Sequence, residues 1–260
     1  MIFHFLHRLP DIAILCIIVT LGVLIAVSAP VIGRRVLRLP DNEERDQSSY
    51  EAFNAIMSMI GIILAFLLVE ANQNLRNIEN TVAQQASAIS ATDRILLLIN
   101  EPGISNLRPQ LAAYGESVIR DEWPAMRLGD RSQKTDEAYN LLSKNIRAVG
   151  PRDAREEAMY NELLKEIDEI ADTREQLIVD SELKLPDIFW TMIGCLFVAA
   201  FAIATFTANV FSRRIGLAAT AGAVALLLAF VIIVDVPFEG ETGVSFRPIQ
   251  SALIVDAQRK

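Results

Sequence analysis

Four long runs of apolar residues without a charged side chain dominate the pattern along the chain. A helix that rises 1.5 Å per residue needs about 20 apolar residues to cross a hydrocarbon layer of roughly 30 Å. Helices at the surface of soluble proteins instead carry polar residues on the side that meets water. The pattern therefore predicts four transmembrane helices, at about 12–33, 52–69, 188–212 and 215–234.

The spacing of these runs predicts an all-α integral membrane protein built from two hairpins. Little more than Arg213 and Arg214 separates the third run from the fourth, and so short a connection requires antiparallel neighbours. A long polar segment separates the second run from the third. The expected divisions are a first transmembrane hairpin at 1–70, an acidic soluble helical bundle at 71–186, a second transmembrane hairpin at 187–236 and a C-terminal tail at 237–260.

The soluble insert has the apolar spacing of helices. No Gly or Pro separates it from the second apolar run, so we expect one continuous helix over about 52–98. After a break at Asn100–Gly103, helical spacing resumes near Leu107, and further helices are expected over about 133–149 and 152–184. The first of these helices has a 3-4 repeat of core positions, occupied by Leu75, Ile78, Val82, Gln85, Ile89, Thr92 and Leu96.

Composition and charge narrow the function. Apolar residues make up 52% of the chain, and the formal net charge is −8. A nucleic-acid partner is not expected, because binding phosphates requires a clustered basic surface. Cys16 and Cys195 both lie inside apolar runs, where a cysteine is interpreted as a small buried apolar residue.

Candidate chemistry is sparse. His4 and His7 are the only histidines, and they stand at the amino terminus without a carboxylate partner nearby, so no metal site is expected. The soluble insert has neither histidine nor cysteine, which excludes the usual nucleophile and base pairs. Glu162, Glu166 and Glu169 share one helical face, which is interpreted as solvated. No catalytic residue and no cofactor are predicted, and the chain is not expected to be an enzyme.

The second apolar run has one stripe of small or polar residues. Asn54, Ser58, Gly61 and Ala65 recur at spacings of four, three and four residues, so they share one side of a helix. Two interpretations stay open. The stripe is a contact between helices, or it faces a pore or a wet cavity.

Three short stretches carry a resemblance to a known family. Each is a local group of aromatic, proline and glycine residues next to a helix boundary. The stretches are Tyr114 with Glu122, Trp123, Pro124, Met126 and Gly129; Leu185 and Pro186 to Trp190 at the start of the third apolar run; and Val236 to Gly240, with Pro237 and Phe238, after the fourth.

With the order of two helices, a helical insert and two more helices, these stretches resemble the bacterial bestrophin-like membrane protein family. The resemblance extends from about Ala52 to Leu253. It implies kinship with bestrophins, which are pentameric anion channels whose pore is lined by the second membrane helix. A homo-oligomer in the bacterial inner (plasma) membrane, with the lipid bilayer and ions as its partners, is therefore expected.

Two family features differ in this chain. The Asn-Pro-Phe-Gly turn of bestrophins is followed by an acidic run that binds calcium in animal members, but Val236 replaces the asparagine here and Glu239 precedes Gly240. The aromatic constriction of animal members also lacks a clear counterpart, because Phe53 and Phe66 are the only aromatic residues of the second run. The acidic turn at Asp235–Glu241 is interpreted as a helix stop, with a cation-binding turn as the alternative.

The orientation in the membrane is left open by two arguments. The short loops contain six arginines, and the positive-inside rule would place them in the cytoplasm. Kinship with bestrophins implies the opposite, with the soluble insert in the cytosol. The arginines are Arg34, Arg35, Arg38, Arg45, Arg213 and Arg214.

Two functions stay open for this chain. The first is a bestrophin-like oligomeric ion channel. The second is a membrane-anchored sensor or scaffold whose helical insert binds a ligand or a partner protein, because two membrane helices on each side of a helical segment resemble a transmembrane receptor in outline.

Overall fold

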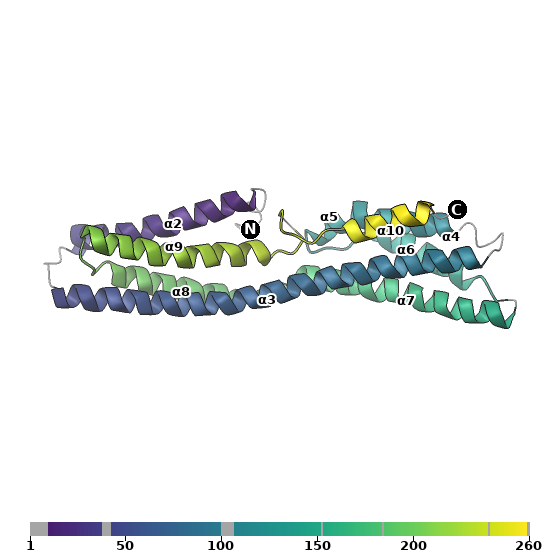
Figure 1. Cartoon of the computed structure of the whole chain (residues 1–260), viewed down its shortest axis with the longest axis horizontal. Helices are drawn as coiled ribbons and strands as arrows, with labels where there is room; N and C mark the ends of the chain where they lie inside the picture. Colours follow the sequence, from purple (N-terminus) through teal and green to yellow (C-terminus); the bar gives the residue numbers. More distant parts are fainter. Residues whose placement is uncertain are drawn as a thin grey trace. The chain divides into compact units, whose positions relative to one another are not determined.

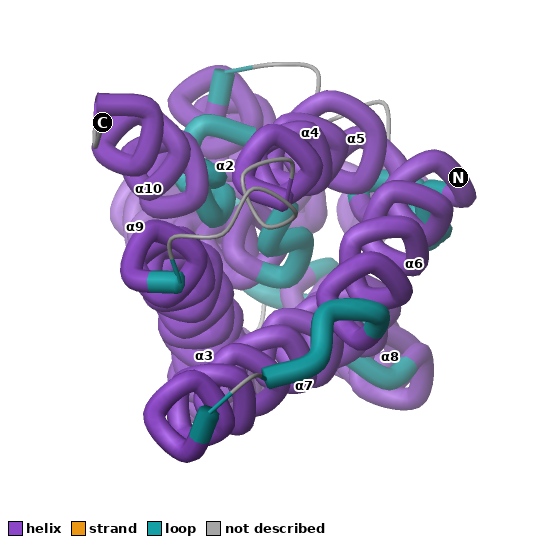
Figure 2. The backbone as a smooth tube through the Cα atoms, turned by 90° about the vertical axis from the view of Figure 1, so that its right-hand side faces the viewer, coloured by secondary structure: helices purple, strands orange, loops and turns teal. Residues whose placement is uncertain are grey.

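The computed structural model describes residues 10–37, 43–99, 107–151, 153–183, 185–238 and 240–258. All regular structure in these ranges is helical (Figures 1 and 2). Four of the helices are long and apolar enough to cross a membrane. The predictions of an all-helical protein and of four such helices are confirmed. The predicted connection at Arg213 and Arg214 was wrong, because the third apolar helix ends at Ala204 and the fourth begins at Phe211, so both arginines lie inside the fourth helix. An apolar run without charge does not by itself mark where a helix ends.

The chain divides into two compact units, which are described separately. Unit 1 contains residues 1–73 and 184–243, and unit 2 contains residues 74–183 and 244–260. Helix α3 (Glu43–Leu98) contributes residues to both. It includes the continuous helix expected over 52–98 and begins earlier, at Glu43.

Unit 1 contains the apolar helices. They are the first part of α3, α2 (Asp11–Ile32), α8 (Asp187–Ala204) and α9 (Phe211–Val234). Helices α2 and α9 approach closely, since a Cβ added at Gly22 would lie 2.8 Å from the Cβ of Ala225. Buried side chains of the four helices form one apolar core, which includes Ala26, Phe53, Met57, Ile60, Leu64, Ile193, Ala200, Leu217 and Val224.

The end of α2 is irregular. Pro30 lies inside the helix and has no N–H to donate, and α2 continues past it into a π-helical turn, η1 (Gly33–Leu37). A Cβ added at Gly33 would lie 1.9 Å from the carbonyl oxygen of Thr205. Glycine is therefore required where this turn contacts the connection between α8 and α9.

The interpretation of the two cysteines as buried residues was wrong. Cys16 on α2 and Cys195 on α8 are both exposed on this chain. An apolar side chain on a membrane helix can face lipid at no cost, so an apolar run does not predict burial inside the protein.

Unit 2 is built from short and long helices around the second part of α3. The others are α4 (Leu107–Ser117), the π-helical turn η2 (Val118–Glu122), α5 (Trp123–Met126), α6 (Gln133–Arg147), α7 (Ala154–Glu182) and α10 (Arg247–Gln258). The predicted core positions of α3 are mostly buried, including the polar Gln85 and Thr92.

The segment expected as a tail contains a helix that packs within unit 2. Helix α10 lies against α4, where a Cβ added at Gly115 would come 2.6 Å from Leu253. Its buried side chains include Ile249 and Ala252. The carboxyl-terminal residues therefore contribute to the core of unit 2.

Candidate functional site

The small-residue stripe of α3 lies largely uncovered on the chain. Ser58 and Ala65 are exposed, and a Cβ added at Gly61 would meet no atom within 4 Å. Asn54 is half-buried, and its Oδ1 accepts a hydrogen bond from Thr220 Oγ1 of α9 at 3.1 Å. One end of the stripe, at Asn54, therefore contacts α9, and the rest of it lies on the surface of the chain.

Larger apolar side chains lie on α3 beside this stripe. Met59, Ile62 and Phe66 are each more than half exposed, and Phe66 reaches 74%. Phe53, by contrast, is 2% exposed in the core of unit 1. The sequence interpretation did not single out this row, although its spacing of three and four residues marks one side of a helix.

Tyr114, from the most specific family stretch, lies at the centre of unit 2. It is fully buried, its Oη accepts a hydrogen bond from Gln85 Nε2 at 3.2 Å, and its ring meets Tyr139 edge to face at 5.9 Å. Burial raises the pKa of Tyr114 above the usual value of a phenol, so its hydroxyl stays protonated well into the alkaline range.

Glu122, from the same stretch, forms a buried ion pair. Arg174 of α7 donates to Glu122 Oε2 through Nη2 at 2.6 Å and to Asp136 Oδ1 through Nη1 at 2.6 Å. Glu122 Oε1 accepts from the backbone N–H of Ser132 at 3.3 Å. Although burial opposes its charge, the contacts with Asp136 and Glu122 raise the pKa of Arg174. The arrangement joins η2, α6 and α7.

The remaining residues of that stretch shape the chain around this pair. Trp123 is buried and meets Phe246 edge to face at 5.8 Å. Pro124 stands in the first turn of α5, where its missing N–H costs nothing, and Met126 is buried. Gly129 has a φ of 69°, a left-handed backbone conformation that glycine adopts more easily than other residues. The structure therefore brings the Glu-Trp-Pro stretch together as a packing and ion-pair centre.

The turn after α9 is tied to the start of α2. Pro237 and Phe238 are buried, and Gly240 has a φ of 78°. Asp11 Oδ2 accepts hydrogen bonds from the N–H and the hydroxyl of Thr242. The carboxylate of Asp11 therefore holds this turn, and Glu239 lies outside the described residues.

The other family stretch lies where α8 begins. Pro186 is the residue that precedes the first turn of α8, and Trp190 is partly buried against the core of unit 1. The N–H of Leu185 donates to Asp235 Oδ1 at 3.0 Å. This bond joins the start of α8 to the end of α9.

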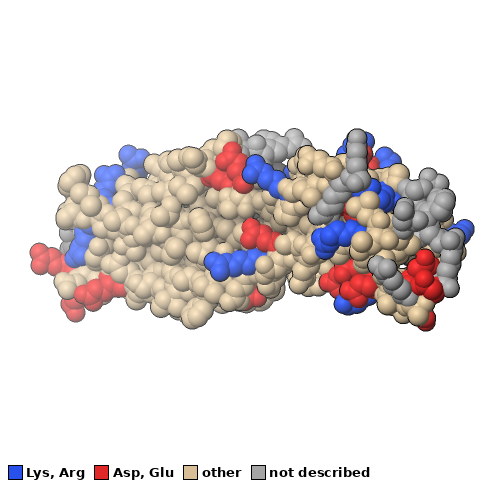
Figure 3. Space-filling view, turned by 45° about the vertical axis from the view of Figure 1, so that its right-hand side comes forward, with Lys and Arg blue, Asp and Glu red and all other residues tan. Residues whose placement is uncertain are grey.

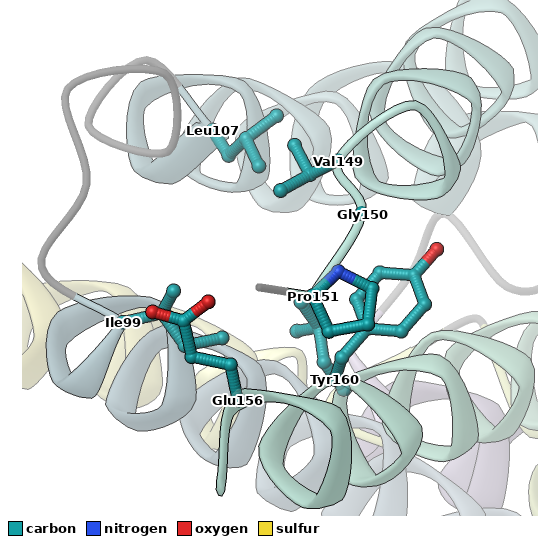
Figure 4. Close-up of a pocket in the computed structure, with 8 residues that line it drawn as sticks. Ile99, Leu107, Val149, Gly150, Pro151, Glu156 and Tyr160 are labelled. Carbon is teal, nitrogen blue, oxygen red and sulfur yellow. The ribbon is translucent and has the colours of Figure 1, made fainter. Parts of the chain in front are cut away.

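The described residues offer no metal site, and the cavity near Leu107 and Tyr160 in unit 2 is small. Within them, no group of three or more His, Cys, Asp or Glu side chains is arranged for a metal, while His4 and His7 lie outside them. The cavity of unit 2 in Figure 4, bounded by Leu107, Val149, Tyr160 and their neighbours, measures about 10 Å³. That volume fits one water molecule at most.

Comparisons with known proteins agree with the motif resemblance. The Bestrophin-like domain family matches residues 19–249. The crystal structure of a bacterial bestrophin homolog from Klebsiella pneumoniae has a TM-score of 0.68 at 13% identity and covers 94% of this chain and 99% of its own. The crystal structure of a membrane protein G264A has a TM-score of 0.69 at 14% identity, covering 94% and 98%. No curated protein matches the sequence. The predicted resemblance is confirmed.

Proposed function

Because the chain belongs to the bestrophin-like domain family, we propose that it forms a homo-oligomeric ion channel. Unit 1 would lie in the bacterial inner membrane as two helical hairpins, and unit 2 would form the soluble bundle. This protein would conduct ions and catalyse no reaction. Kinship with bestrophins, which are ion channels, supports this function over that of a membrane-anchored sensor or scaffold.

The observation that carries the proposal is the uncovered side of α3. In a membrane span, one side of α3 holds the core of unit 1 through Met57, Ile60 and Leu64. The other side exposes the small Ser58 and Ala65 with the open Gly61. Small side chains leave room for a path when copies of a helix surround an axis, and a hydroxyl can hydrogen-bond the water within it.

The row of Met59, Ile62 and Phe66 gives this path a means of control. A ring of large apolar side chains narrows a pore and closes it by excluding water. In the proposed channel, these residues form an apolar constriction at the same depth along α3 as the small stripe, which lies beside them on the helix. Phe66 then supplies the aromatic residue at the constriction.

The alternative of a ligand sensor has less support. A ligand site needs a cavity of a few hundred Å³, and the cavity near Leu107 and Tyr160 in unit 2, at about 10 Å³, is too small to be that site. The polar centre around Glu122 and Arg174 is saturated by contacts within the unit. These contacts serve the packing of unit 2.

Ion flux from liposomes tests the proposal. Purified full-length protein should release chloride or potassium from loaded vesicles, and Gly61→Leu should remove most of that flux by filling the path. Gly194 of α8 is the matched control, because an added Cβ there also meets no atom within 4 Å, and Gly194→Leu should conduct normally. Vesicles without flux for either ion, or equal flux from Gly61→Leu and the unchanged protein, would contradict the proposal.

A further inference from the structure

A cavity of about 230 Å³ lies among the four helices of unit 1. Its lining is apolar and comes from α2, α3, α8 and α9, including Ala26, Met57, Phe201 and Ala221. Leu21 and Ile25 line it and are also about half exposed, so the cavity has its mouth on the α2 side. An empty apolar space of this size weakens packing, whereas in a bilayer hydrocarbon can fill it.

Arginines gather at one end of the same helices. Positions 22 and 23 of α2 face positions 225 and 222 of α9. This antiparallel register brings Arg34 and Arg35 to the level of Arg213 and Arg214, and the contact of Gly33 with Thr205 fixes that end. Figure 3 shows a broad surface without charged side chains, with basic and acidic groups collected at the end of unit 1 where α2 ends and α9 begins.

The arginines at this end differ in what they bind. Arg213 forms an ion pair with Asp46, with 3.0 Å between Nε and Oδ2, and its Cζ lies 4.5 Å from the centroid of the Tyr50 ring. Arg35 and Arg214 are exposed, and within the described residues neither has an ion pair. Large apolar side chains, among them Val36 and Phe211, are exposed beside them. Exposed cations next to apolar groups are typical of a surface at the level of lipid headgroups.

The distance along α9 from Arg214 to the cavity matches the distance from the headgroup of a lipid to its acyl chains. The lining residues of α9 run from Ala221 to Leu228, about 10 to 21 Å along the helix from Arg214. A bilayer has about 6 Å of headgroup layer above about 15 Å of hydrocarbon in each leaflet. We propose that this end of unit 1 binds an anionic phospholipid, with its phosphate on Arg35 and Arg214 and one acyl chain in the cavity.

This site is independent of ion conduction, and lipid binding tests it directly. The full-length protein in detergent is titrated with phosphatidylglycerol or phosphatidylcholine of the same chains, and bound lipid is counted by native mass spectrometry. The protein should prefer phosphatidylglycerol. Arg35→Gln with Arg214→Gln should reduce that affinity roughly tenfold or more, since each arginine near the headgroups contributes to it. It should reduce the affinity for phosphatidylcholine much less, because the choline cation already balances the phosphate of that lipid. Arg120→Gln with Arg247→Gln, at two exposed arginines of unit 2, is the matched control and should change the affinity for neither lipid.

A second variant tests the cavity. Ala221→Leu should reduce binding of both lipids by filling the space of the acyl chain, while Ala219→Leu, at an exposed position of α9 outside the cavity, should not. If the leucine prevents folding, Ala221→Val makes the same test with less added volume. The proposal is overturned if the arginine variant keeps the preference for phosphatidylglycerol or if Ala221→Leu binds normally. Displacement of the lipid by inorganic phosphate, or a changed subunit count in Ala221→Leu, would also overturn it, because the site would then hold a soluble anion or a second copy.

Discussion

Arg174 donates two hydrogen bonds to one carboxylate oxygen of Glu122, at 2.6 and 3.2 Å, across 52 residues of sequence. Glu122 is 1% exposed, so this pair stands in the interior of unit 2. Its contacts with Asp136 and Ser132 connect η2 to α6 and α7. The glutamate of the family stretch therefore acts through the packing of the soluble unit.

Arg174→Met should strongly destabilise the protein. The change leaves the Glu122 carboxylate buried without its cation, which costs about 3–5 kcal/mol. Adding Glu122→Gln should recover part of the loss, because the uncompensated charge is then absent. Arg131→Met is the control, since its pair with Glu175 is exposed and is worth about 0–1 kcal/mol. Thermal unfolding in detergent measures all four proteins, and a double variant no more stable than Arg174→Met would contradict this role.

Alkaline pH should destabilise unit 2 through Tyr114. Burial raises the pKa of this hydroxyl in the folded protein, whereas in the unfolded chain it ionises near pH 10. The folded state therefore keeps its stability below about pH 10 and loses it as the pH rises further. Tyr114→Phe should weaken this pH dependence, although it removes the acceptor of Gln85. Unfolding temperatures at pH 8 and pH 10.5 test the point, and an unchanged difference between them in the variant would count against it.

Gly33→Ala should destabilise unit 1. The added Cβ would lie 1.9 Å from the backbone oxygen of Thr205, and backbone cannot move aside as a side-chain end can. Overpacking of this kind costs about 1–3 kcal/mol. Gly194→Ala adds the same atom where none lies within 4 Å and should be tolerated. The two unfolding temperatures in detergent are the test, and equal values would show that η1 does not need its close contact with Thr205.

Gly240→Ala should cost more than Gly129→Ala. Both glycines have positive φ, at 78° and 69°, so alanine is strained at either position by about 1–2 kcal/mol. At Gly240 the added Cβ would also lie 3.1 Å from Asp11 Oδ1, while at Gly129 it would meet nothing within 4 Å. Adding Asp11→Ala to Gly240→Ala should remove the extra crowding but also the hydrogen bonds from Thr242, so Asp11→Ala alone is measured beside it, and the cost of Gly240→Ala should be smaller in the Asp11→Ala background. Equal unfolding temperatures for the two single variants would argue against the close contact between this turn and Asp11.

Much of the helical content could be predicted because a membrane imposes a length on each span. The apolar runs at 52–69 and 215–234 need no partner to be recognised. The family stretches could also be found locally, because turn and cap residues such as Pro124 and Gly129 act on their own backbone. These local signals were enough to predict the helices and the family.

Contacts that join distant parts of the chain could not be predicted. Nothing in the local pattern indicates that Glu122 would meet Arg174 among many surface charges, or that Asp11 would bind Thr242. Helix α10 was missed because its short apolar pattern is completed only by packing on Gly115. Likewise, the uncovered side of α3, with Ile62 and Phe66, becomes visible only after the other side has packed into the core.

Modification of a cysteine at Ser58 tests most directly whether α3 lines a conducting path. Cys16 and Cys195 are exposed, so both are first replaced by serine, and Ser58→Cys or Gly194→Cys is added. A charged thiol reagent is then applied while ion flux from liposomes is measured. The channel account predicts that the reagent blocks flux through Ser58→Cys and spares Gly194→Cys. Unchanged flux through modified Ser58→Cys, or block of Gly194→Cys alone, would contradict it.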